Sequence, residues 1–396
     1  MRNASTYRGC GFFLFALAVA WSAGLFAYAA VQDRSPAAKP QALIAAMAKY
    51  RQELAAYLQA RDAFQAAAKT YWSLIAEKRR SRNGKRARGT ALSLDDYVLE
   101  QPPVYSGPPK PRDPSKPPEP PQPPPYVPVV ADFLAAAVNE FKFTPRMPRN
   151  DGEFKRAYVA AAAAAGLSKV QVVRIYSFEA TGNGTYDLEA GLGYNKNGQA
   201  ITTALGYNQL LATNSVEILA ESGERFVAAL AATAQRLPDD AKKALEKKLA
   251  IVRKMIAFAK SVPDDWNEHE VLARTQKGLA IHATNLDLDF GPLLQTQKLL
   301  DSIVFARRKG FAAPLSAAEL EMMNLTGDGN GFDMVTMPQD WRDKVPTANF
   351  FQQHGYADNP VVQRNNVVAK LLAATDAVMD SEVKKPGAKE LAADFP

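Results

Sequence analysis

Residues 168–187, SKVQVVRIYSFEATGNGTYD, place a glutamate between an apolar helix and a glycine-rich stretch. Val170, Val173 and Ile175 predict a helix that is apolar on most sides and therefore buried, and Glu179 stands at its end. Burial raises the pKa of a carboxyl group, and the dipole at a helix C-terminus also disfavours a negative charge. A carboxyl that stays protonated near neutral pH can act as a general acid. The alternative is a purely structural residue at a helix end.

A second polar stretch follows at residues 203–215, TALGYNQLLATNS, where two neutral amides interrupt an apolar run. One interpretation is a turn held by bonds from side chain to backbone. The other is the wall of a groove that hydrogen-bonds something polar, such as a sugar. The residues alone leave both interpretations open.

Taken in order along the chain, these features resemble the lytic transglycosylases of the lysozyme superfamily. In that family a buried helix ends in the catalytic Glu, a Gly-x-x-Gln motif follows, and an Asn lies beside a glycine-rich turn. Here Glu179, Gly206 with Gln209, and Asn324 fill those places. The resemblance spans about residues 169–355, slightly under half the chain.

The resemblance implies that Glu179 is a general acid and then a base. It would protonate the glycosidic oxygen between N-acetylmuramic acid and N-acetylglucosamine, and then take the proton of the muramyl 6-hydroxyl as a 1,6-anhydro ring closes. The implied substrate-binding residues are Tyr207, Asn208, Gln209 and Asn324, and the implied partner is the peptidoglycan glycan strand.

Residues 180–199 would be an insertion over the groove in such an enzyme. A hydrolase would instead need a second acid roughly 5–9.5 Å away. Asp187 or Glu189 could supply it, although either could equally be a solvated loop charge.

The sequence predicts neither a metal site nor a nucleotide cofactor. The tract TGDGNGFD at 326–333 lacks the Gly and Glu positions of a calcium-binding loop, so we expect a turn there. His269, His282 and His354 have no metal-ligand or nucleophile-base spacing. There is no Walker or dinucleotide glycine motif.

Residues 1–29 have the pattern of a secretory signal peptide: early arginines, an apolar run and a small-residue cleavage site. We therefore expect an exported protein of the periplasm or cell envelope, with an uncleaved membrane anchor as the alternative. Cleavage would remove Cys10, the only cysteine, which excludes disulfides, thiol nucleophiles and zinc–thiolate sites.

The formal charge of +7 is concentrated between Lys78 and Arg88, where seven cations occur in eleven residues. From Val129 to the end the chain has 30 basic and 32 acidic residues, which excludes a basic nucleic-acid-binding domain. The basic run is either solvated and disordered or binds an anionic membrane or wall polymer.

The pattern along the chain predicts an all-α protein. We expect a long amphipathic helix over 41–80, a basic and proline-rich disordered linker over 81–128, a lysozyme-like helical catalytic domain over 129–380 and a flexible tail over 381–396. Within the domain, apolar periodicity predicts helices at 132–142, 153–165, 169–179, 216–235, 239–261, 265–284, 292–309, 317–324 and 359–380. The competing function is a noncatalytic peptidoglycan-binding or cell-envelope scaffold protein.

Overall fold

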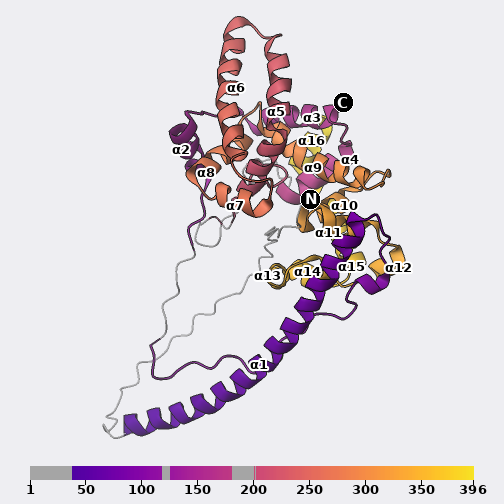
Figure 1. The fold of residues 1–396 in the computed structure, drawn as a ribbon. Helices are drawn as coiled ribbons and strands as arrows, with labels where there is room; N and C mark the ends of the chain where they lie inside the picture. Colours follow the sequence, from indigo (N-terminus) through magenta and orange to yellow (C-terminus); the bar gives the residue numbers. More distant parts are fainter. Residues whose placement is uncertain (1–37, 118–124, 181–199, 201) are drawn as a thin grey trace. The chain divides into compact units, whose positions relative to one another are not determined.

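The computed structural model describes residues 38–117, 125–180, 200 and 202–396. The chain divides into two compact units at about residue 125. The described residues form helices and no β-strand, apart from two isolated bridges, which confirms the all-α prediction (Figure 1). None of the described helices is long and apolar enough to cross a bilayer. The expected signal peptide and most of the densest proline tract lie outside the described residues.

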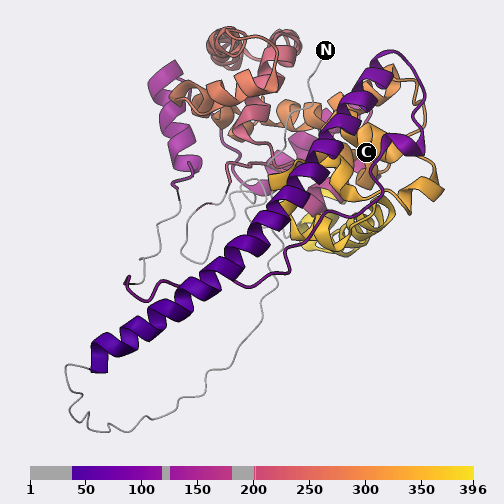
Figure 2. The same cartoon turned by 60° about the horizontal axis from the view of Figure 1, so that its bottom comes forward.

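The N-terminal unit is one long helix with a segment that returns along it. Helix α1 spans Ala38–Ala87, and the chain turns back after it through the short 3-10 helix η1, Leu94–Asp96 (Figure 2). Tyr105 lies edge-on to Tyr57 and Phe64, with ring centroids 6.3 and 5.6 Å apart. A Cβ at Gly107 would come within 2.7 Å of Ala60, so glycine allows the close approach. The first part of the proline-rich segment therefore packs against a helix.

The basic run, except its last residue Arg88, lies within α1, which extends beyond the expected end at residue 80. The Arg82 guanidinium lies 4.7 Å from the ring centroid of Tyr97 and donates to the carbonyl of Asp96 at 3.0 Å. Lys85 forms an ion pair with the Asp96 carboxylate at 2.7 Å. These cations hold the returning segment on the helix, which is a structural use that charge counting did not predict. Binding to an anionic surface stays a prediction.

The C-terminal unit, from residue 125 onward, is a packed set of helices. Its α-helices are α2 Val130–Phe141, α3 Asp151–Ala164, α4 Lys169–Ala180, α5 Ala212–Ala234, α6 Asp239–Ala259, α7 Trp266–Ala273, α8 Gln276–His282, α9 Gly291–Arg308, α10 Ala317–Thr326, α11 Asp328–Thr336, α12 Gln339–Arg342, α13 Gln353–Ala357, α14 Pro360–Arg364, α15 Val368–Glu382 and α16 Pro386–Ala393. Two 3-10 helices, η3 Ala283–Leu286 and η4 Thr347–Phe350, lie between them. Helices α5 and α6 form the hairpin at the top of Figure 1.

Helix α4 packs against α3, α10, α15 and α16, and so lies within the unit as expected. Its buried residues include Val172, Ile175 and Tyr176, whereas Val170 is 63% exposed. The helix is therefore exposed in its first turn and mostly buried from Gln171 onward, with Glu179 partly exposed near its end. Because α10 packs against α4, the glutamate lies against protein and not on an open helix face.

Two expected helices are each divided in the structure. The helix predicted at 265–284 separates into α7 and α8, because the side chain of Thr275 accepts from the Gly278 amide and starts a new helix. The helix predicted at 359–380 separates into α14 and α15, and the intervening Val367 forms a bridge with Pro346.

The expectation that the TGDGNGFD tract is a turn was wrong. Helix α11 begins within this tract, directly after α10. Gly327 has φ +80° and reverses the chain between the two helices. A Cβ at Gly331 would lie 2.3 Å from the Cα of Met323, so this glycine lets α11 pack closely on α10. The glycines here serve helix packing.

The last part of the chain, which we expected to be a flexible tail, contains α16. This helix packs on α3 and α4. Lys155 is a fully buried residue of α3, and its ammonium lies 2.7 Å from the carboxylate of Asp151 in α3 and 2.7 Å from that of Glu390 in α16. Desolvation lowers the pKa of Lys155, but bonds to these two carboxylates act in the opposite direction and leave it raised. The lysine stays charged and attaches α16 to the unit.

Candidate active site

Helices α4, α9 and α10 bring Glu179 together with three other polar side chains. Glu179 lies one residue before the end of α4, Glu321 and Asn324 lie one turn apart on α10, and Lys298 lies on α9. Helix α10 packs against both α4 and α9, which explains the convergence. The spacing of three places Glu321 and Asn324 on one face of α10.

Glu179 has two hydrogen-bond partners on α10. The Asn324 side-chain amide donates to its Oε1 at 3.1 Å. The Glu321 carboxyl also shares a hydrogen bond with Glu179. The charge of Lys298 acts on both carboxyl groups. The structure therefore brings together two of the sequence-predicted residues, Glu179 and Asn324, with a second acid, Glu321, that sequence reasoning missed.

Burial raises the pKa of Glu179 to about 7, although the hydrogen bonds from Glu321 and Asn324 and the charge of Lys298 act to lower it. Burial raises the pKa of Glu321 well above its ordinary value, and the adjacent Glu179 raises it further. Glu321 is 3% exposed, whereas Glu179 is half-buried. The less solvated carboxyl holds its proton more tightly, so Glu179 is the member of the pair that exchanges its proton near neutral pH.

The structure places Tyr207 and Asn208 in the interior. The Tyr207 ring is fully buried and its hydroxyl donates to the Asp151 carboxylate at 2.7 Å. It packs edge-on against Tyr176 of α4, with centroids 4.6 Å apart. The Asn208 amide donates to the Gln295 carbonyl and to the Tyr158 hydroxyl. Tyr207 therefore packs against α4 within the core. Neither side chain is accessible to a glycan in this arrangement.

Gln209 belongs to the turn that contains Gly206. Its side-chain amide donates to the Gly206 carbonyl at 2.8 Å, and its backbone has φ +46°. Gly206 has φ +82°, and a Cβ there would lie 2.3 Å from Gln295 Nε2. The amides of this stretch therefore fix a turn against α9. A substrate-binding role for Gln209 stays a prediction.

Glu321 had a readable signal in the sequence. It lies three residues before Asn324 within the helix predicted at 317–324, so both belong to the same predicted face. An acid at a predicted buried position beside a candidate binding residue marks a site with a shifted pKa. Asp187 and Glu189, the other acids considered, lie outside the described residues, as does nearly all of the expected insertion.

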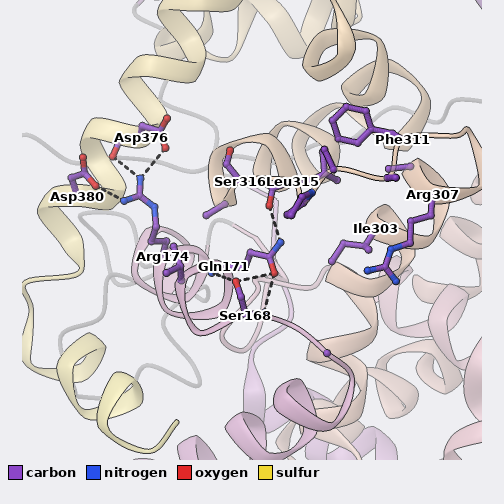
Figure 3. Close-up of a pocket in the computed structure, with 17 residues that line it drawn as sticks. Ser168, Gln171, Arg174, Ile303, Arg307, Phe311, Leu315, Ser316, Asp376 and Asp380 are labelled. Carbon is purple, nitrogen blue, oxygen red and sulfur yellow. Dashed lines mark hydrogen bonds and ion pairs between the residues drawn. The ribbon is translucent and has the colours of Figure 1, made fainter. Parts of the chain in front are cut away.

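A separate hollow of about 670 Å³ opens near the start of α4 (Figure 3). Gln171 donates to the Leu315 carbonyl at 2.7 Å, and Arg174 is paired with Asp376 and Asp380. Glu179 lies five residues beyond Arg174, about 7.5 Å along the helix axis. The hollow does not include the carboxyl pair.

A buried Ser–His pair resembles catalytic chemistry only superficially. Ser215 Oγ lies 2.8 Å from His282 Nδ1, and His282 Nε2 lies 2.7 Å from the carbonyl of Thr203. Both side chains are fully buried, and burial lowers the pKa of His282 to about 4. This pair joins α5 to α8. In the part of the chain that is described, no group of three or more His, Cys, Asp or Glu could hold a metal ion.

Comparisons of the chain with protein-family models, with curated proteins and with solved structures found no match.

Proposed function

We propose that this protein is an exported lytic transglycosylase that cleaves peptidoglycan glycan strands, with a lysozyme-like catalytic domain over 129–380. The observation that supports the proposal is the environment of Glu179, whose burial gives it a pKa of about 7 beside the amide donor Asn324. An acid with a pKa near the working pH both donates and accepts a proton efficiently. This is the requirement for one residue that acts as acid and then as base.

The proposed reaction uses the Glu179 carboxyl twice, first as an acid and then as a base. Glu179 donates its proton to the oxygen that links N-acetylmuramic acid to N-acetylglucosamine, and the glycosidic bond breaks. The muramyl 6-hydroxyl then attacks the anomeric carbon and transfers its proton to the Glu179 carboxylate. The products are a free N-acetylglucosamine end and a 1,6-anhydro ring, and Glu179 is protonated again. Asn324 holds the Oε1 atom of Glu179 during both steps.

The second acid in the site does not fit a hydrolase. Retaining enzymes separate their carboxyl groups by about 5–5.5 Å and inverting enzymes by about 6.5–9.5 Å. Glu321 shares a hydrogen bond with Glu179, so the two carboxyl groups stand at direct hydrogen-bonding distance, closer than in either class of hydrolase. No sugar or water can lie between two carboxyl groups at that distance. Among the residues that the structure describes, the arrangement favours a mechanism with a single exchanging acid.

The test is digestion of purified peptidoglycan by the wild-type protein and by Glu179→Gln, followed by mass spectrometry of the fragments. We expect muropeptides that have lost one water from the terminal muramyl residue, and a rate lowered by about 10²–10⁴-fold in the variant. Glu319→Gln is the matched control, because Glu319 lies on α10 and pairs with Arg342 at 3.4 Å. Products with a free muramyl reducing end would indicate a hydrolase. Binding without any release of fragments would indicate the scaffold function.

A further inference from the structure

Glu321 is a buried acid that the single-acid mechanism leaves without a role. It is 3% exposed, and its Oε2 atom has no hydrogen-bond partner among the described residues. An ionised carboxylate with an unsatisfied buried oxygen is costly, whereas a protonated one is neutral and can donate. The neighbouring acceptor for such a proton is the Glu179 carboxyl.

We propose that Glu321 is a positioning residue that keeps its own proton throughout the reaction and donates a hydrogen bond to Glu179. With the amide of Asn324, it supplies the second of two donors to the Glu179 carboxylate. The proposal rests on the proposed function for its chemistry, while the hydrogen bond itself is a property of the fold.

The two donors act on the state of Glu179 that follows the first proton transfer. Once Glu179 has protonated the glycosidic oxygen, it is an anion in a largely enclosed place. The hydroxyl of Glu321 and the amide of Asn324 then stabilise that anion and fix its orientation until the muramyl 6-hydroxyl returns a proton. The Glu321 proton does not leave, so the proton balance of the reaction is unchanged.

Two substitutions separate this role from simple packing. Glu321→Gln retains a donor, because its amide can point at Glu179. Glu321→Leu has similar bulk and no donor. We expect Glu321→Leu to lower kcat by about 10- to 100-fold, the value of one hydrogen bond to a charged group, and to move the alkaline limb of the pH–rate profile upward. Glu321→Gln should keep most of the activity and a profile close to that of the wild type.

An activity-independent measurement tests the same bond. A titration of glutamate carboxyl carbons by ¹³C NMR should show one group titrating near pH 7 that is absent in Glu179→Gln. A second group should remain protonated at that pH and be absent in Glu321→Gln. In Glu321→Leu, the Glu179 signal should titrate at a higher pH.

The outcomes distinguish the two proposals. The inference about Glu321 is overturned if its carboxyl titrates in the ordinary glutamate range, or if Glu321→Leu leaves the titration of Glu179 unchanged. It is also overturned if Glu321→Gln and Glu321→Leu lose activity equally with no change in pH profile. If the NMR result holds and no anhydro-muropeptides form, the transglycosylase proposal fails and the hydrogen bond stands.

Discussion

The raised pKa of Glu179 makes a quantitative prediction about stability. Folding shifts this pKa from 4.5 to about 7, a difference of about 2.5. Each unit corresponds to about 1.4 kcal/mol, so the complete shift amounts to about 3 kcal/mol, and partial exposure to solvent reduces this to about 2–3 kcal/mol. Because the folded protein binds the proton more tightly, the free energy of unfolding falls as the pH rises from 4.5 to 7.

Glu179→Gln removes this penalty while retaining a side chain of the same size. At pH 4 both the glutamate and the glutamine are neutral, so the wild type and the variant should be equally stable. At pH 8 the variant should be about 2–3 kcal/mol more stable, because the wild type has then ionised an enclosed carboxyl. Urea denaturation at pH values from 4 to 8, followed by circular dichroism, measures the difference.

The control for this series is Glu319→Gln. Glu319 accepts a hydrogen bond from the backbone amide of Ser316 and pairs with Arg342. A glutamine can keep the first contact but not the ion pair, so no stabilisation should develop with rising pH. Equal stability of Glu179→Gln and the wild type at pH 8, or the same gain at pH 4 and pH 8, would refute the idea that the fold keeps Glu179 protonated.

Three further substitutions, one with a control, test the supporting structure. Gly206→Ala should lower the free energy of unfolding by at least about 1–2 kcal/mol because of the left-handed backbone, and by more because of the contact with Gln295. The control Gly310→Ala, at φ +85° with nothing within 4 Å, should show only the backbone cost, so the difference between the two variants in chemical denaturation measures the contact. Asn208→Leu should lower the free energy of unfolding by about 1–3 kcal/mol, because it leaves the buried Tyr158 hydroxyl without its partner, and an unchanged melting temperature would contradict this. Arg82→Ala should weaken the attachment of the returning segment to α1 by about 0.5–2 kcal/mol. Proteolytic cleavage between residues 88 and 108 should then become faster, and an unchanged cleavage pattern would contradict the prediction.

Helix prediction succeeded where the signals were local. Helix α10 begins where Ser316 and Glu319 form a capping box, a pattern that can be read directly from four residues. Ser168 likewise accepts from the Gln171 amide at the start of α4. The helix expected at 216–235 begins earlier, at Ala212, and Asn214 accepts from the Leu211 amide within its first turn.

Prediction was weaker where a helix depends on its neighbours. Helix α11 lies in a glycine-rich tract with poor intrinsic helix propensity, and close packing on α10 stabilises it. Helix α16 is short and depends on the buried ammonium of Lys155 for its attachment. A tyrosine and an amide within an apolar run can face either a groove or the interior, and the sequence does not distinguish the two. Tyr207 and Asn208 were assigned to a groove, but both side chains are buried in the interior.

The sequence by itself determined the helical class and the place of Glu179 at a helix end, because periodicity, capping and the transition to glycine are properties of adjacent residues. Only the tertiary structure decided that Glu321 shares its hydrogen bond with Glu179, since the two lie on helices far apart in the chain. The pKa of a carboxyl depends on the atoms around it in space, and α10 supplies those atoms. The chemistry of this site is therefore a consequence of how α4, α9 and α10 pack.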